Sequence, residues 1–218
     1  SMLVGICAAL LVLCIGALYG SISGYCGGMV DAVMQRIVEV IYSVPEVLVI
    51  LLLSAMLGEA IKAYSGPGSA FVATMGANLI SMFMAFGMLY WVGMSRIIRG
   101  QVLQVKQQEY VTAARALGAS SGRIIKRHLL PNCIGQLVVT TCLQIPSAIF
   151  LESFLSFLGV GVDTPMTSLG SMCSDALGGM YTYPERLLIP AALLSVTILC
   201  LNLVGDGLRD ALDPKLKT

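Results

Sequence analysis

The sequence predicts an all-α membrane protein, a polytopic bundle of about five transmembrane helices. Hydrophobic residues fill 57% of the 218 positions and charged residues only 11%, whereas a soluble domain carries about a quarter charged residues. The mean hydropathy is +0.87, and several apolar runs reach the roughly 20 residues that cross a bilayer as a helix. The formal net charge of +1 gives no reason to expect a nucleic acid partner.

Five apolar runs are the candidate spans, and together they predict a single transmembrane domain over residues 1–218. The first run contains no charged residue, and its length suits a span better than a signal peptide. Each boundary is approximate, and the spans are expected at residues 2–23, 37–57, 70–94, 134–158 and 187–204.

Glycines recur at every fourth position of the first span, at Gly16, Gly20 and Gly24. Their shared face has no side chains, so another helix can approach it closely. We expect a packing seam inside the bundle rather than a dedicated dimer motif.

Ionisable residues and prolines interrupt two of the spans. Glu46 follows Pro45 in the second span, and Glu152 lies in the fourth. Carboxylates inside membranes line polar pathways or pair internally, so these three residues are pathway candidates, with a purely structural role as the alternative. Pro45 and Pro146 should each kink their helix, because proline lacks the backbone donor.

Basic residues predict the orientation of the chain. Residues 96–131 hold seven of the thirteen Lys and Arg residues and a single acid, Glu109. Short basic loops lie on the cytoplasmic side, so the loop at about 96–133 and the tail at about 207–218 should be cytoplasmic. The segments 58–69 and 159–186 should face outward, as should the start of the chain.

The outward segment 159–186 is rich in Gly, Ser, Thr and Pro. We expect a structured loop with a short helix at about 168–177 that partly re-enters the membrane. Its composition leaves open whether it docks an external partner or only connects two spans.

The basic loop itself should form two short helices. Tyr110, Ala113, Ala114 and Leu117 recur at helical spacing and give one narrow apolar face. Gly118 is placed to end this helix in a left-handed conformation. Ser120 or Ser121 can then cap a second, basic helix that ends at Pro131.

Two partners suit this loop on physical grounds. The narrow alanine face fits a groove on another protein, while the basic residues fit anionic lipid head groups. Neither partner is excluded by the residues alone.

The stretch 109–132 resembles the cytoplasmic coupling loop of ABC importer permeases, whose pattern is E-A-A, three residues, G, nine residues, I, one residue, L-P. Ala113, Ala114, Gly118, Leu130 and Pro131 match that spacing. Thr112 replaces the family's Glu, and His128 replaces its Ile. The segments 24–48, 153–165 and 201–216 also resemble the dipeptide, oligopeptide and nickel branch of these permeases, so the resemblance covers nearly the whole chain.

The resemblance implies a type I importer permease fold and an N-terminal span beyond those found here. It implies four kinds of partner: a second permease subunit, two cytoplasmic ATPase subunits, an extracytoplasmic substrate-binding protein and membrane lipid. Small peptides are the expected cargo, with nickel or another small solute as the alternative. The residues expected to couple to the ATPases are Glu109, Tyr110, Thr112, Ala113, Ala114, Arg115, Leu117, Gly118, His128 and Pro131.

This chain is not expected to be an enzyme or to hold a cofactor. It has no G-x-x-x-x-G-K-[ST] phosphate loop, so ATP and Mg would be used by the partner subunits. Seven cysteines without a C-x-x-C pair and one histidine predict no metal site. The expected location is the cytoplasmic membrane of a bacterium or archaeon.

Three other classes of membrane protein remain as alternatives. An ion-driven secondary transporter would show internal repeats, and five spans cannot divide evenly. A membrane enzyme would need clustered catalytic groups, for which the isolated His128 is poor material. A scaffold without transport activity is the third.

Overall fold

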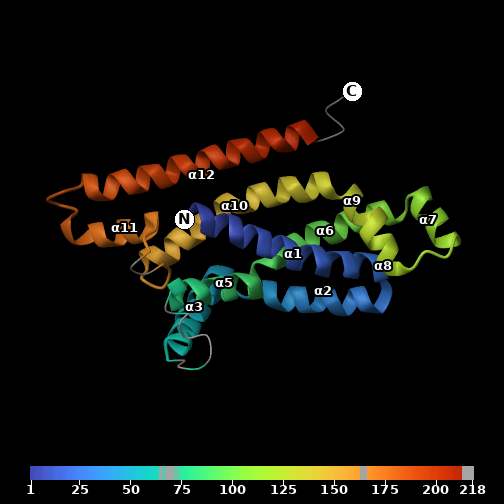
Figure 1. Cartoon of the computed structure of the whole chain (residues 1–218), viewed down its shortest axis with the longest axis horizontal. Helices are drawn as coiled ribbons and strands as arrows, with labels where there is room; N and C mark the ends of the chain where they lie inside the picture. Colours follow the sequence, from blue (N-terminus) through green and yellow to red (C-terminus); the bar gives the residue numbers. More distant parts are fainter. Residues whose placement is uncertain (64–65, 67–71, 73, 163–165, 213–218) are drawn as a thin grey trace.

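The computed structural model describes residues 1–63, 66, 72, 74–162 and 166–212, and the regular elements within them are all helices (Figure 1). In chain order they are α1 (Met2–Cys26), α2 (Gly28–Tyr42), α3 (Glu46–Lys62), α5 (Ala77–Leu89), α6 (Trp91–Lys106), α7 (Glu109–Ala116), α8 (Ser121–Ile124), the π-helix η1 (Ile125–Leu129), α9 (Leu130–Asn132), α10 (Ile134–Phe157), α11 (Leu169–Ala176), the 3₁₀ turn η2 (Leu177–Gly179) and α12 (Glu185–Leu212).

Helix α1 lies in the middle of the bundle, where it packs mainly on α6 and α10 (Figure 1). Helix α12 lies outside α10, and α2 lies on the opposite side of α1. The basic loop and the C-terminal end of α12 lie toward one end of the bundle, while α11 lies at the other. Ser1 belongs to the α11 end, since its hydroxyl accepts a hydrogen bond of 3.2 Å from the Leu169 amide.

Within the described residues, four helical segments are long and apolar enough to cross a membrane: Met2–Cys26, Ala77–Lys106, Ile134–Phe157 and Glu185–Leu212. The pair α2 and α3 supplies a fifth if it is one broken span. The predicted fold class is therefore confirmed, and each of these helical segments overlaps one of the predicted runs; the predicted start of the third run, at residue 70, lies outside the described residues.

The second predicted span is not one kinked helix, as the sequence led us to expect, but two helices that differ in direction by 80°. Helix α2 ends at Tyr42, and the Ser43 hydroxyl donates a hydrogen bond of 2.8 Å to the Val40 carbonyl. Pro45 then leaves helical geometry, with φ −59° and ψ 106°. It has no amide to donate back to α2, so the chain turns and α3 begins at Glu46.

Two other predicted boundaries also differ from the structure. The third span was expected to end at residue 94, but α6 continues to Lys106, so residues 96–106 belong to a helix rather than to the loop. The fifth was expected to end at residue 204, but α12 continues to Leu212. Polar residues extend both helices beyond the apolar runs, and hydropathy cannot detect such extensions.

The glycines of α1 form the predicted seam, and α6 is the helix that uses it. A Cβ atom at Gly16 would lie 2.7 Å from the Met94 Cβ, and one at Gly24 would lie 3.0 Å from the Arg99 carbonyl oxygen. A Cβ at Gly20, between them, would overlap the Ser95 carbonyl oxygen. The two backbones therefore approach each other closely at three points spaced about one helical turn apart.

An ion pair next to this seam joins α2 to α6. The Arg99 guanidinium donates two hydrogen bonds to the Asp31 carboxylate, of 2.6 Å from Nε and 2.5 Å from an Nη atom. The Ser23 hydroxyl of α1 donates a third, of 2.5 Å, and Gln35 donates one of 3.0 Å to that hydroxyl. Three helices thus share one polar contact whose carboxylate is only 14% exposed.

We expect Gly20→Ala to lower the thermal stability of the protein. The added methyl group would displace α6, and overpacking of this kind costs about 1–3 kcal/mol. Gly100→Ala on α6 is the matched control, because a Cβ there meets nothing within 4 Å and alanine favours helix by about 0.5–1 kcal/mol. Thermal unfolding in detergent measures both variants, and an unchanged midpoint for Gly20→Ala would contradict a tight seam.

Candidate functional site

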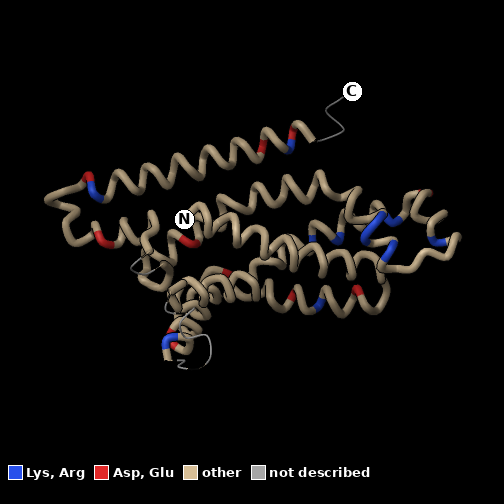
Figure 2. The backbone as a smooth tube through the Cα atoms, in the orientation of Figure 1, with Lys and Arg blue, Asp and Glu red and all other residues tan. Residues whose placement is uncertain are grey.

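The basic loop forms a compact helical unit at one end of the bundle. Lys and Arg residues gather on it, as Figure 2 shows around α8 and α7. Helix α7 follows α6 after only two residues, Gln107 and Gln108, and α8, η1 and α9 lead back into α10. The predicted short helix, sharp turn and second helix are confirmed.

Gly118 ends α7 as predicted, with φ +80°. The Gly118 amide donates a hydrogen bond of 3.0 Å to the Arg115 carbonyl, and the Ala119 amide donates one of 3.1 Å to the Ala114 carbonyl. This pair of bonds is the Schellman motif, which requires the left-handed conformation that glycine adopts most readily. The direction of the chain after α7 therefore depends on Gly118.

A buried residue that the sequence argument overlooked anchors α7 to the bundle. Val111 is 1% exposed and packs in the same apolar cluster as Ile98 and Val102 of α6. Ile124 and Leu129, from α8 and η1, are fully buried in that cluster. Their apolar character and helical spacing are the signal in the sequence that indicates this anchor.

The predicted docking face of α7 remains largely uncovered. Tyr110 and Leu117 are 42% and 88% exposed, Ala113 is exposed and Ala114 is half-buried. The described residues thus bury one side of α7 through Val111 and leave the small apolar side free for contact with another molecule.

Charged side chains join α7 to the end of α1. The Arg115 guanidinium lies 5.6 Å from the centroid of the Tyr25 ring, and the Lys106 ammonium lies at the same distance from that ring. Lys106 also donates a hydrogen bond of 2.5 Å to the Tyr25 carbonyl. Among the predicted coupling residues, Arg115 contacts the end of α1 in this way. Glu109 and Thr112 are exposed.

His128 lies against α7, with its ring centroid 6.4 Å from that of Tyr110. It therefore links the two arms of the loop. The prediction that Pro131 ends the second helix is wrong, because α9 runs from Leu130 to Asn132 and α10 begins at Ile134. The π-helical turn η1 ends at Leu129, two residues before this proline. Such a turn alters the hydrogen-bond pattern where the proline supplies no donor.

A second candidate site is a cavity at two helix breaks. Glu46 begins α3 just after the 80° bend, and Tyr90 stands between α5 and α6. Both residues line two adjoining cavities, of about 430 and 720 Å³. Pro45 lines the larger one, so two of the three pathway candidates lie together.

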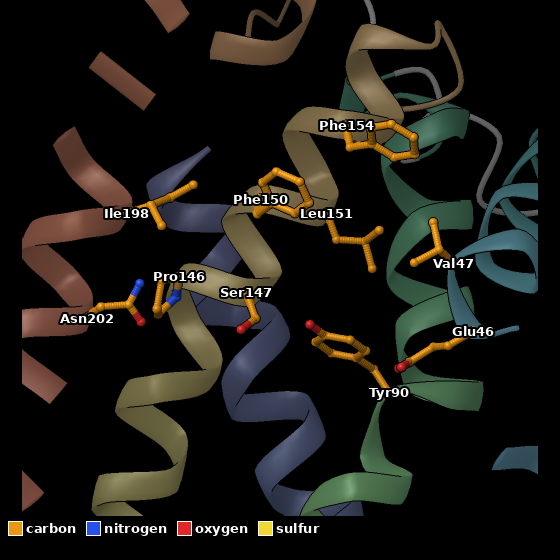
Figure 3. A pocket seen from close by; sticks show the side chains of 10 residues that line it. All are labelled: Glu46, Val47, Tyr90, Pro146, Ser147, Phe150, Leu151, Phe154, Ile198 and Asn202. Atoms are coloured by element: carbon orange, nitrogen blue, oxygen red, sulfur yellow. The ribbon is translucent and has the colours of Figure 1, made fainter. Parts of the chain in front are cut away.

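The smaller cavity lies between α3, α10 and α12 (Figure 3). The Tyr90 and Ser147 hydroxyls point toward one another inside it, and the Glu46 carboxylate lies beside the Tyr90 ring. Helix α10 continues through Pro146, which also lines the cavity. Its walls are otherwise mainly apolar, and the full lining is Glu46, Val47, Tyr90, Pro146, Ser147, Phe150, Leu151, Phe154, Ile198 and Asn202.

Glu152 lies apart from these cavities and is completely buried. Its carboxylate accepts hydrogen bonds of 2.8 Å from the Ser156 hydroxyl and 3.3 Å from the Ser153 hydroxyl. The Ser156 hydroxyl in turn accepts a bond of 3.0 Å from the Val162 amide. This arrangement joins Glu152 to the turn that follows α10, as the structural alternative for Glu152 requires.

The end of the bundle opposite the basic loop holds the short helix expected at 168–177. It is α11, and a reciprocal cap begins it. The Ser171 amide donates a hydrogen bond of 3.1 Å to the Ser168 hydroxyl, and the Ser168 amide donates one of 2.9 Å to the Ser171 hydroxyl. Within the described residues, no group of three or more His, Cys, Asp and Glu side chains is placed to hold a metal ion.

Comparison with known proteins identifies the family. Residues 16–218 match the family described as binding-protein-dependent transport system inner membrane component. The chain is 43% identical over 217 residues to the oligopeptide transport system permease protein OppC of Bacillus subtilis. It is 44% identical over 218 residues to the dipeptide transport system permease protein DppC of the same organism. These matches cover all of this chain but only 65% and 62% of the two relatives.

Solved structures support the same fold. An amino acid ABC transporter superposes with a TM-score of 0.58 at 17% identity, covering 96% of this chain and 91% of that one. The MetNI methionine ABC transporter gives 0.59 at 15% identity, covering 97% and 96%. The helical bundle, the loop with its matched motif and the full-length similarity agree, and the chain belongs to the family of inner membrane components of binding-protein-dependent transport systems.

Proposed function

We propose that this chain is a permease subunit of an ATP-driven importer for small peptides. Two relatives that it matches along its whole length are named as oligopeptide and dipeptide permeases. The main support for the mechanism comes from α7. Its small-residue face is exposed, while Val111 anchors the helix to the bundle. A second permease subunit would complete the pathway, and an extracytoplasmic binding protein would deliver the peptide.

Two cytoplasmic ATPase subunits would supply the energy, each holding one such helix in a groove. ATP and Mg would be bound and used in those subunits. The basic loop and the end of α12 would then be cytoplasmic, as the concentration of Lys and Arg at that end supports. Ser1 and α11 would face the binding protein.

The contacts supply a route by which movement of α7 could reach the pathway. Arg115 and Lys106 hold the Tyr25 ring at the end of α1. Directly after it, Gly27 and Gly28 adopt positive φ values of 67° and 54° and form the corner between α1 and α2. Helix α2 then leads to the 80° bend and to Glu46. Displacement of α7 would turn these rigid segments about the corner and the bend.

The cavity at Glu46 and Tyr90 would be this subunit's part of the pathway. A carboxylate at its edge suits the ammonium group that every unmodified peptide carries, and the apolar walls tolerate varied side chains. Selectivity among peptides would then rest with the binding protein.

Ala113→Trp is expected to weaken the contact between α7 and its ATPase subunit. The indole would hold α7 out of its groove, and a misfit of about 1.4 kcal/mol is already tenfold in binding. Transport and substrate-stimulated ATPase should both fall by about tenfold or more in reconstituted vesicles. Ala116→Trp is the matched comparison and should have a smaller effect, because Ala116 is also exposed but lies three residues along the helix, at the border of the docking face rather than within it.

The amount of complex in the membrane must be equal for both Ala→Trp variants. Wild-type transport and wild-type stimulation of the ATPase in Ala113→Trp would contradict the proposed docking face. Equal loss in both variants would show that the helix, rather than this face, is what matters.

Glu46→Gln is expected to slow peptide uptake about fivefold, since a lost charge attraction of about 1 kcal/mol has that effect. Glu59→Gln is the matched control on the same helix, where the carboxylate is 79% exposed and paired with Lys62. Uptake of a labelled dipeptide into vesicles measures both. Full uptake by Glu46→Gln at normal expression would remove Glu46 from the pathway.

A further inference from the structure

Two neighbouring cavities at the loop end of the bundle have opposite chemistry and share one residue, Pro131. The first, of about 410 Å³, is lined by Arg123, Lys126, Arg127 and Pro131. The second, of about 460 Å³, lies between α1 and the start of α10 and is lined by Leu13, Cys14, Ala17, Leu18, Leu130, Pro131, Ile134 and Leu137.

The three cations of the first cavity share a helical face and lack counterions. Arg123, Lys126 and Arg127 stand at i, i+3 and i+4, which places them side by side. All three are exposed, and within the described chain none of them forms an ion pair with a carboxylate. This concentrated positive charge attracts a multiply charged or phosphate-bearing anion.

The second cavity belongs to the membrane-spanning part of the molecule. Leu13, Ala17 and Leu18 lie in the middle part of α1, and Ile134 and Leu137 lie in the first turn of α10; both helices are candidate spans. Leu18 and Ile134 are 63% and 55% exposed. An apolar groove at this depth opens to hydrocarbon rather than to water.

We propose that the two cavities form one binding site for an anionic phospholipid. The phosphate and head group contact Arg123, Lys126 and Arg127, and an acyl chain lies in the groove beside Ala17, passing Pro131. The amphipathic shape argues for this occupant, because the groove has no cation and the basic cavity has no carboxylate among its lining residues. A soluble ATPase subunit could meet the cations but could not fill a groove at bilayer depth.

This site gives the loop a second partner on a separate surface. The lipid contacts α8, η1 and the start of α10, whereas the uncovered side of α7 carries Ala113 and Leu117. Both arms of the loop are packed together through His128 and Tyr110. Bound lipid therefore steadies the arm that supports α7, whatever solute the protein carries.

The test is native mass spectrometry of the chain purified with its associated subunits and exposed to phosphatidylglycerol or phosphatidylcholine of equal acyl length. The wild type should retain phosphatidylglycerol at least about fivefold better, since each cation near an anionic lipid contributes about one such factor. The triple variant Arg123→Gln/Lys126→Gln/Arg127→Gln should lose that preference. Ala17→Phe, which fills the groove without altering charge, should reduce retention of phosphatidylglycerol as well.

A matched charge control is Arg36→Gln/Arg209→Gln, which removes exposed cations away from the site and should keep the preference. Equal retention by the triple variant and the wild type would overturn the proposal. The proposal would also be overturned if the triple variant lost its ATPase subunits but kept its preference for phosphatidylglycerol, because the three cations would then bind the ATPase rather than lipid. Unchanged retention by Ala17→Phe would remove the groove from the site. None of these readouts depends on transport, so they stand apart from the choice of cargo.

Discussion

The backbone contact between α1 and α6 determines where the rest of the molecule lies. Glycine at positions 16, 20 and 24 lets the two helices touch without intervening side chains. Helix α6 then runs directly to the loop, with only Gln107 and Gln108 before α7. The seam therefore fixes the base from which the loop projects, and the buried cluster around Val111 and Ile98 fixes the loop on that base.

The seam lies within two continuous helices, whereas both candidate sites lie where a helix ends. Gly118 reverses the chain at one end of the bundle, and Pro45 and Tyr90 mark two further breaks that both line the larger cavity. Rigid segments joined at such points can move as bodies while their internal packing stays intact. The polar contact of Asp31 with Arg99 keeps α2 attached to α6 on the loop side of the bend.

Much of this architecture could be predicted because membrane helices must satisfy their backbone internally and remain apolar outside. The runs that became α1, α10 and α12, the cap at Gly118 and the helix after Ser168 followed from local patterns. Hydropathy has no direction, however, so a kink could be expected at Pro45 but not a turn of 80° between two separate helices. The Asp31–Arg99 pair joins residues 68 positions apart, so no local pattern indicates it. The Tyr90 hydroxyl belongs to a cavity that exists only where α3, α10 and α12 meet. Pro131 does not end the second helix as predicted, because the preceding π-helical turn changes the hydrogen-bond pattern where proline supplies no donor.

The shallow packing of α12 has a consequence for how the chain is made. Within its described residues α12 buries only Pro190 and Gly205, and its stretch 187–204 carries no charge. Such a helix enters a bilayer through its own hydrophobicity and can dock later. Helix α2 is different, because Asp31 emerges from the ribosome long before Arg99 exists to neutralise it. The polar contact that joins α1, α2 and α6 can therefore form only after α6 has been synthesised, whereas α12 needs no such partner to enter the bilayer.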